Sequence, residues 1–156
     1  KIVNTHGIKG ELRIKSDFLI KERVFKKGMS YYIGKDKILE KVASYRHHKD
    51  FEMVCFEGYD NINQVLKYLK SNVYVKKDDL CLKDDEYILE ELIGFQVIEN
   101  EEVLGKIQEI MYNSSNVLLY VKAEKNFYIP NNSHFIKKVD MLKKEVIVEN
   151  TKGLIL

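Results

Sequence analysis

The amino-acid sequence predicts a mainly β protein with two consecutive small β-barrels, joined by a short charged linker, and one short helix in the first half. Three observations predict this fold. Most apolar residues lie in short segments separated by turn residues, one segment alone has helical spacing, and one densely charged stretch divides the chain near its middle. With 156 residues and 45% hydrophobic content, the chain is long enough for one domain or for two small ones.

The first half begins with strand-like segments. Residues 11–15 alternate polar and apolar side chains with a period of two. A half-buried strand has this pattern because successive side chains face opposite sides of a sheet. Further along, pairs of apolar segments flank short polar loops, as in a β-hairpin. The two predicted hairpins join residues 31–33 to 38–39 and residues 42–46 to 51–57.

One later segment of the first half has helical spacing instead. Four apolar residues recur at i, i+3, i+4 and i+7, which places them on one face of a helix. Asp60 and Asn61 precede them, and either side chain suits a helix N-cap. We expect a helix of about ten residues, then a strand at 73–75 that completes the first barrel. The four apolar residues are Ile62, Val65, Leu66 and Leu69.

The best domain boundary is the most densely charged stretch of the chain. Residues 76–86 contain only three apolar side chains, as is typical of an exposed linker between domains. We therefore predict a first domain at residues 1–78, a linker at 79–85 and a second domain at 86–156.

Strand-like segments resume after the linker, separated by polar turns. We expect roughly five or six short antiparallel strands in about seventy residues. So many strands in so small a unit must hide their edges, and closure into a barrel does this. The expected strands include residues 93–98, 103–111, 117–121, 127–129 and 146–148.

The charge of the chain is unevenly distributed. The net charge is +2, but residues 1–80 hold 17 Lys and Arg against 11 Asp and Glu, a net charge of +6. Residues 81–156 hold 9 against 13, a net charge of −4. This asymmetry predicts a basic surface that phosphates can neutralise and an acidic surface that suits a basic protein. Charged loops that only keep the chain soluble are the alternative.

Apolar runs and cysteines bear on where the protein works. No apolar run exceeds five residues, far short of the roughly 20 that a transmembrane helix needs, so we expect no contact with a membrane. Cys55 and Cys81 stand alone, as the reduced thiols of a cytoplasmic protein do. Because the sequence starts at Lys1 and not at a methionine, it does not exclude a targeting segment before this residue.

No combination of residues indicates an active site. Gly7 and Gly10 lie between strand-like segments, where positive φ or a close backbone approach is needed, but the ending of a phosphate-binding P-loop is missing. His6 has no serine or cysteine nucleophile in an identifiable relation to it, and a turn histidine is the simpler interpretation. The four histidines lack zinc-ligand spacing, and the paired carboxylates are typical of solvated loops. We predict no catalysis, no metal and no cofactor.

Two groups of basic and aromatic residues suit RNA instead. Residues 21–27 and 45–49 combine cations, which meet phosphates, with rings that stack on unpaired bases. For each group, an ordinary solvated loop is the alternative.

Four blocks of sequence are individually weak motifs but occur in a specific order. The chain opens at residues 1–14 with a strand-like segment that contains His6-Gly7-Ile8-Lys9-Gly10-Glu11. The other blocks lie within residues 48–69, 85–94 and 129–154. Together they span nearly the whole chain and resemble the RimM family.

The resemblance implies a barrel similar to that of translation factors, followed by a PRC-barrel domain. It also implies a ribosome assembly factor that binds the immature small (30S) ribosomal subunit at its head. The partners would be a basic ribosomal protein of the head, uS19 in the family, and nearby rRNA. The factor would promote subunit maturation and rRNA processing without catalysis, and we expect a cytoplasmic monomer.

The second domain departs from the family at one position. Adjacent tyrosines are usual at its start, whereas here Tyr87 is followed by Ile88, which keeps apolar contact but has no phenolic hydroxyl. The resemblance implies partner binding by Tyr87, Ile88, Leu92 and Gly94. For rRNA binding we expect His6, Lys9, Arg13, Arg46, His47, His48 and Lys49.

Two rival functions stay open. One is a PRC-barrel protein–protein adaptor with a non-ribosomal partner, and the weaker one is an RNA-processing enzyme. Salt-sensitive binding to small-subunit RNA would disfavour the adaptor.

Overall fold

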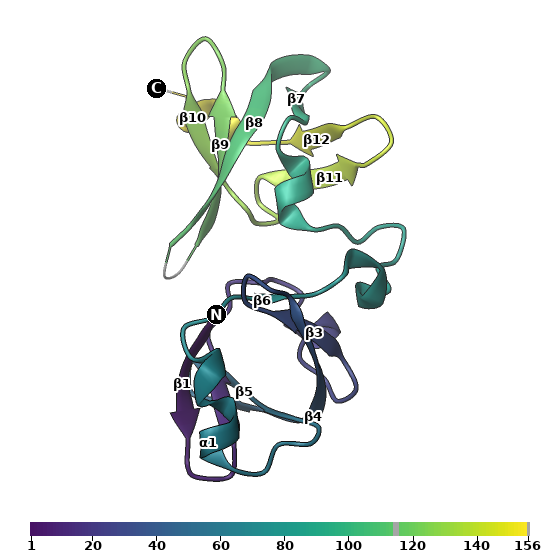
Figure 1. Cartoon of the computed structure of the whole chain (residues 1–156). Helices are drawn as coiled ribbons and strands as arrows, with labels where there is room; N and C mark the ends of the chain where they lie inside the picture. Colours follow the sequence, from purple (N-terminus) through teal and green to yellow (C-terminus); the bar gives the residue numbers. More distant parts are fainter. Residues whose placement is uncertain (114–115, 156) are drawn as a thin grey trace. The chain divides into compact units, whose positions relative to one another are not determined.

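The chain forms two compact units, residues 1–82 and 83–156, in a computed structural model that describes residues 1–113 and 116–155 (Figure 1). The structure is mainly β with one short α-helix, as predicted. The division falls inside the stretch expected to be a linker. Two contacts nevertheless attach part of that stretch to the first unit. Leu80 is only 1% exposed, and the Arg23 guanidinium donates a hydrogen bond to the Cys81 carbonyl oxygen at 2.8 Å.

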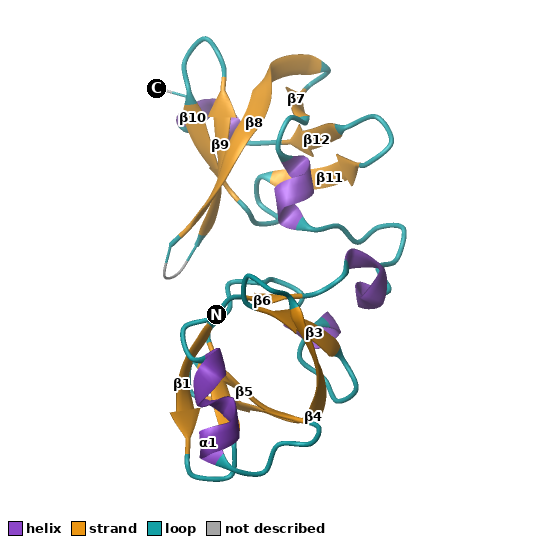
Figure 2. Cartoon of the chain, viewed as in Figure 1, coloured by secondary structure: helices purple, strands orange, loops and turns teal. Residues whose placement is uncertain are grey.

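The first unit is one six-stranded antiparallel sheet that curls on itself (Figure 2). Its order is β1-β2-β5-β4-β3-β6. The Ile2 N–H donates to the Ser71 carbonyl at 3.0 Å and the Lys70 N–H donates to the Ile2 carbonyl at 2.8 Å, so backbone hydrogen bonds join β1 to the segment before β6. The strands are β1 Ile2–His6, β2 Glu11–Ile14, β3 Ser30–Ile33, β4 Ile38–His48, β5 Phe51–Phe56 and β6 Val73–Tyr74.

The period-two pattern of the sequence produces the core of this barrel. In β2, Leu12 and Ile14 are buried, whereas Glu11 and Arg13 are half-exposed on the other side. Aromatic rings fill the interior, where the Phe56 ring makes edge contacts with the rings of Tyr31 and Tyr68. Such edge-to-face pairs add to the stability that burial of apolar surface provides.

The helix is shorter than the ten residues expected. α1 spans Ile62–Val65 and continues as a 3₁₀ turn, η2 Leu66–Tyr68. Asn61 is the N-cap, since its side chain accepts a hydrogen bond from the Asn63 N–H at 2.8 Å. The helix ends early because Leu69 adopts an extended backbone, which lets the next residues pair with β1.

The second unit is a six-stranded sheet with one parallel pair. Its order is β10-β9-β8-β7-β12-β11, and β12 runs parallel to β7 although we expected antiparallel strands throughout. The chain leaves β10 at one edge and returns as a β11–β12 hairpin beside β7, so the direction of β12 follows from that crossover. The strands are β7 Gln96–Glu99, β8 Glu102–Tyr112, β9 Val117–Lys122, β10 Phe127–Pro130, β11 Ile136–Asp140 and β12 Glu145–Val148.

Two local features of the second unit differ from the expected strands. The strand expected at 93–98 begins only at Gln96, because Leu89–Leu92 form a 3₁₀ turn, η4, and Gly94 has φ +93°. β11 was not expected, because Ile136 and Val139 are its only apolar residues. The other 3₁₀ turns are η1 Lys21–Arg23, η3 Lys77–Leu80 and η5 Thr151–Gly153.

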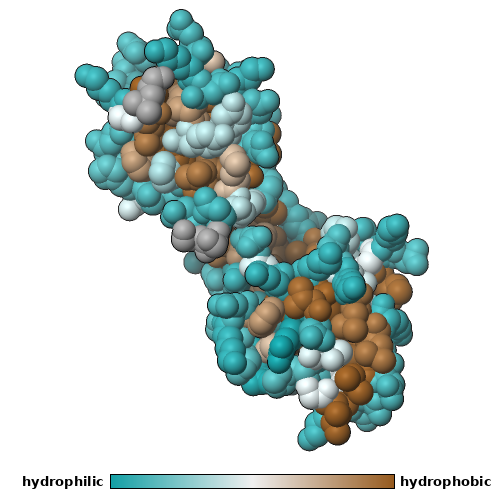
Figure 3. Space-filling view, turned by 90° about the vertical axis from the view of Figure 1, so that its left-hand side faces the viewer, coloured by the Kyte–Doolittle hydropathy of each residue, from teal (hydrophilic) through white to brown (hydrophobic). Residues whose placement is uncertain are grey.

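Apolar side chains also reach the surface of both units. Figure 3 shows them as brown patches among hydrophilic residues on the face in view. Within the described residues, no helix is both long enough and apolar enough to cross a membrane.

Candidate nucleic-acid and protein-binding site

Four of the residues expected to bind rRNA gather on the outer face of the first barrel. His6, Arg13, Arg46 and His48 project from β1, β2 and β4, and with Glu11 they form what we call the outer-face cluster. An Arg13 guanidinium nitrogen (Nη2) lies 2.8 Å from His6 Nδ1, and the His6 and His48 rings are 5.8 Å apart. Residues 33 to 42 positions apart in the sequence are therefore brought together by strand pairing.

Ionic hydrogen bonds fix the geometry of this cluster. Arg46 donates two hydrogen bonds to the Glu11 carboxylate, at 2.9 and 2.7 Å, a bidentate pair that lowers the pKa of Glu11 and raises that of Arg46. Burial, together with the cations of Arg46 and Lys49, lowers the pKa of His48. Because a guanidinium can only donate, His6 Nδ1 is the acceptor in this contact.

The cluster carries excess positive charge. Glu11 compensates Arg46, but the Arg13 side chain meets a histidine and lies 5.7 Å from the Phe51 ring centroid rather than beside a carboxylate. Within the described residues, the buried Arg13 Nε has no hydrogen-bond partner. The cluster therefore offers an uncompensated guanidinium and two imidazoles, groups that interact with phosphate.

His47 lies apart from the outer-face cluster. Successive residues of β4 face opposite sides, so His47 and Tyr45 contact Glu52, which is 2% exposed. His47 Nδ1 lies 3.0 Å and Lys21 Nζ 3.6 Å from the Glu52 carboxylate. Burial acts to raise the pKa of Glu52, but the hydrogen bonds of Tyr45 and His47 outweigh it and the pKa is lowered. The sequence prediction treated residues 45–49 as one group, although the alternation of side chains along a strand places neighbouring residues on opposite faces.

The two lysines expected to bind rRNA lie in exposed turns. Lys9 is in the turn between β1 and β2, and Lys49 is in the turn between β4 and β5. Gly10, in the first turn, is buried with φ +91°, and a Cβ there would lie 3.4 Å from the Asn61 backbone. Glycine at this position lets the turn pack against the start of α1.

The expected partner-binding residues of the second unit divide into surface and core. Tyr87 and Ile88 are half-buried just before η4, and burial raises the pKa of the Tyr87 phenol. Leu92 was expected to contact the partner, but it is 0% exposed and is therefore a core residue. Gly94 is exposed and its N–H donates to the Ile107 carbonyl at 2.7 Å, which fixes the end of η4.

Two acidic residues, Glu90 and Glu91, follow Tyr87 closely in the chain. They were not among the residues predicted to bind the partner. Glu90 accepts a hydrogen bond from the Tyr112 hydroxyl, which ties η4 to β8. Glu91 follows on the same turn, and Ile93 is 48% exposed. We call Tyr87, Ile88, Glu90, Glu91 and Ile93 the η4 surface. Its combination of apolar and acidic groups suits a basic protein.

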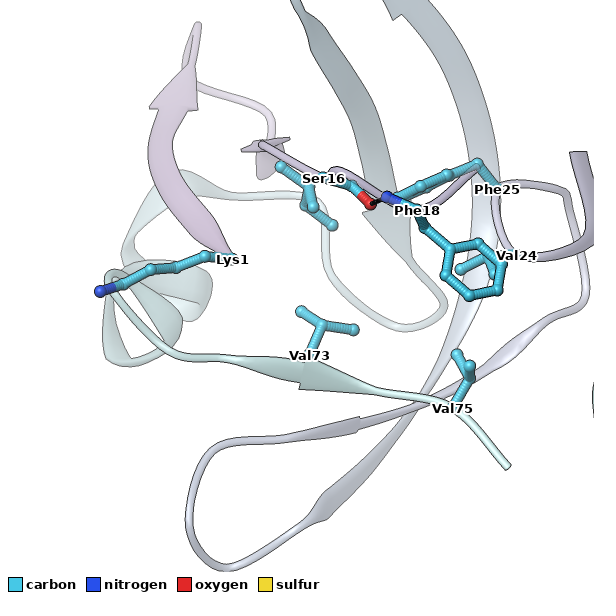
Figure 4. A pocket seen from close by; sticks show the side chains of 8 residues that line it. Lys1, Ser16, Phe18, Val24, Phe25, Val73 and Val75 are labelled. Carbon is cyan, nitrogen blue, oxygen red and sulfur yellow. Dashed lines mark hydrogen bonds between the residues drawn. The ribbon is translucent and has the colours of Figure 1, made fainter. Parts of the chain in front are cut away.

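The pocket in Figure 4 belongs to the first unit, and its lining does not resemble a catalytic or metal site. It is lined mainly by apolar side chains, and the Phe18 N–H donates to Ser16 Oγ at 3.1 Å within it. Across residues 1–113 and 116–155, no three His, Cys, Asp or Glu residues gather in a way that could hold a metal ion. The lining residues are Lys1, Ile14, Ser16, Phe18, Val24, Phe25, Val73 and Val75.

Comparison with known proteins decides the family. Residues 1–80 match the model of the RimM N-terminal domain, and residues 89–154 match that of the RimM PRC barrel domain. The chain belongs to the RimM family. A Ribosome maturation factor RimM from Bacillus anthracis is 37% identical over 99% of this chain and 95% of the relative. One from Staphylococcus haemolyticus is 34% identical over 99% and 96%.

A solved RimM structure is also similar. It is a crystal structure described as a 16S ribosomal RNA processing protein RimM from Pseudomonas aeruginosa, with 17% sequence identity and a TM-score of 0.42. The match covers 96% of this chain and 94% of that chain.

Proposed function

We propose that this RimM-family chain is a non-catalytic ribosome maturation factor that binds the immature small subunit at its head. Its partners are a basic ribosomal protein of the head, uS19, and nearby rRNA. Relatives that match over nearly the whole length of the chain are named ribosome maturation factors, which supports the role in maturation.

The observation that carries this proposal is the separation of charge between the two units. The division at residues 82 and 83 leaves a net charge of +6 on the first unit and −4 on the second. A basic unit attracts the phosphates of rRNA, and an acidic unit attracts a basic protein. One chain can thus hold RNA and protein together during assembly.

The outer-face cluster is the proposed rRNA contact. Arg13, His6 and His48 contact phosphates, and Lys9 and Lys49 extend the basic surface at the turns. Arg46 is held by Glu11 and shapes the cluster. His47 faces the other way, so we assign it to the Glu52 group and not to the RNA contact.

The η4 surface is the proposed contact for the basic head protein. Tyr87 and Ile88 supply apolar area, while Glu90 and Glu91 supply negative charge. Leu92 and Gly94 hold this surface in place from the core and from the end of η4.

The proposed mechanism is differential binding. The protein holds rRNA and the head protein in an arrangement competent for assembly, and it dissociates when packing in the mature head competes for the same surfaces. Its own residues catalyse no reaction, and we infer that it acts as a cytoplasmic monomer.

Sedimentation of cell extract through a sucrose gradient tests the proposal. We expect the protein to co-migrate with free small subunits and to be absent from complete ribosomes. Migration only with non-ribosomal proteins would instead support a PRC-barrel adaptor. Cleavage or modification of precursor rRNA by the purified protein would contradict a non-catalytic role.

Tyr87→Ala tests the protein contact. Removal of a half-buried interfacial ring should weaken binding to immature subunits by on the order of 2 kcal/mol. Tyr128→Ala is the matched control, because Tyr128 is a tyrosine of the same unit that lies on β10, outside the η4 surface, and is 44% exposed. Equal recovery of immature subunits by wild type and Tyr87→Ala in a pull-down would remove Tyr87 from the interface.

A further inference from the structure

A row of outward-facing side chains crosses three strands of the first barrel, with Tyr32 half-buried at its centre. Strand pairing places Tyr32 of β3 between Leu39 of β4 and Tyr74 of β6. Tyr32 faces outward, because its strand neighbours Tyr31 and Ile33 are 0% and 1% exposed in the core. Leu39 and Tyr74 are its cross-strand partners and therefore lie on the same face. Leu39 is 57% and Tyr74 43% exposed. We call these three residues the tyrosine row.

Two lysines lie over the tyrosine rings. Lys37 Nζ is 3.3 Å from the Tyr74 ring centroid, and Lys76 Nζ is 5.3 Å from the Tyr32 ring centroid. Lys41 of β4 lies opposite Ser30, one outward position further along the same strands. Positive charge is therefore concentrated beside both rings.

Carboxylates do not neutralise this charge. Within the part of the chain that the structure describes, Lys37, Lys41 and Lys76 form no ion pair with Asp or Glu. Glu40 of β4 accepts a hydrogen bond from the Tyr68 hydroxyl at 2.7 Å, and it lies opposite the buried Tyr31. Asp36 is the acidic residue of the β3–β4 turn. The outward face of these strands is thus basic as well as aromatic.

Outward-facing rings on a basic sheet favour single-stranded RNA as the ligand. Bases stack on aromatic faces whatever their sequence, and lysines neutralise the phosphates between them. A cation–π contact at an exposed site is weak, so a base that stacks on Tyr74 can displace the Lys37 ammonium toward a phosphate. An acidic protein would match the charge, but it would not need aromatic rings on which bases can stack.

We propose that the tyrosine row binds single-stranded RNA, with bases stacked on Tyr32 and Tyr74 and phosphates held by Lys37 and Lys76. This goes beyond the proposed function, because the row contains none of the residues assigned to rRNA above. It lies on β3, β6 and the start of β4, whereas the outer-face cluster lies on β1, β2 and the end of β4 (Figure 1). The barrel then has two RNA-binding surfaces.

The test is fluorescence anisotropy of the full chain with a labelled oligouridylate of about twelve nucleotides, a length in the range of one small single-strand site. Tyr74→Ala should weaken binding by about 5- to 150-fold, the loss expected for one stacked base. Tyr74→Phe keeps the ring and should bind like the wild type. The double substitution of Lys37 and Lys76 by alanine should lower the slope of log affinity against log salt by about 1.4, corresponding to two phosphate contacts.

The matched control for Tyr74→Ala is Tyr128→Ala, because Tyr128 is 44% exposed but belongs to the acidic unit. It should leave the affinity for the oligonucleotide unchanged. Circular dichroism of each variant checks that the barrel is folded, and the lysine double variant tests the surface without altering a strand.

Three outcomes would overturn the inference. They are unchanged binding by folded Tyr74→Ala, an equal loss in Tyr128→Ala, and absence of oligouridylate binding by the wild type at low salt. If Tyr74→Ala lost binding to subunits but not to the oligonucleotide, the row would be a protein interface and the RNA assignment wrong. Co-migration of the wild type with small subunits is measured separately, so failure of the proposed function is distinguishable.

Discussion

Replacement of Gly105 by alanine tests how closely the strands of the second unit approach one another. A Cβ at position 105 would lie 2.4 Å from the Lys122 carbonyl oxygen and 3.0 Å from side-chain carbons of Ala123 and Val121. Carbon and oxygen approach no closer than about 3.3 Å even in a C–H···O contact, so the backbones of β8 and β9 must separate by about 1 Å. The obstacle is backbone, which cannot rotate away.

The expected cost follows from this clash. Overpacking that forces backbone shifts costs about 1–3 kcal/mol, and the closeness to a carbonyl places Gly105→Ala near 2–3 kcal/mol. For a unit of this size, residues 83–156, that corresponds to a fall in melting temperature of about 10–20 °C.

Calorimetry with hydrogen exchange measures the effect. The second unit should melt earlier, while amides of residues 1–82 keep their protection. Gly153→Ala is the matched control, because a Cβ there has nothing within 4 Å and φ is not positive, so stability should change little. Equal melting temperatures for Gly105→Ala and wild type would show that β8 and β9 can accept a Cβ at this position without cost.

Two further predictions concern the first unit. Glu52→Gln should destabilise the first unit at pH 7. The pKa of Glu52 is below its ordinary value of 4.5, so the ionised carboxylate contributes its full stabilisation above pH 4.5. This stabilisation is lost as the pH falls through the lowered pKa. Thermal melts between pH 7 and 3 should therefore show the difference from wild type shrinking with acid, and a constant difference would contradict it. Asn61→Ala should cost about 1 kcal/mol through loss of the N-cap hydrogen bond. Urea denaturation would measure this, and an unchanged midpoint would show that the cap contributes nothing.

Local patterns in the sequence predicted most of the strands and the site of the helix. Alternation at residues 11–15 placed Leu12 and Ile14 inside, as the structure shows. The helical spacing and Asn61 located α1, but its length depended on the pairing of residues 70–71 with Ile2. β11 escaped prediction because its two apolar residues give no clear period.

The candidate site was predictable only in part. His6, Arg13, Arg46 and His48 were named from sequence, and strand pairing brings them together. The bidentate pair of Arg46 with Glu11 was not predicted, because the two residues are 35 positions apart and no local pattern connects them. Likewise, helical or strand spacing does not distinguish a core residue such as Leu92 from a contact residue.

The amino-acid sequence alone was enough to show that the protein is mainly β, that its charge is divided between two halves, and that its motifs resemble one family throughout. Which strands are neighbours could be seen only in the folded chain, including the parallel pair β7–β12 and the row of Leu39, Tyr32 and Tyr74. This difference arises because side-chain periodicity is a property of consecutive residues. Strand neighbours depend instead on where distant segments bury their apolar faces, which no local pattern specifies.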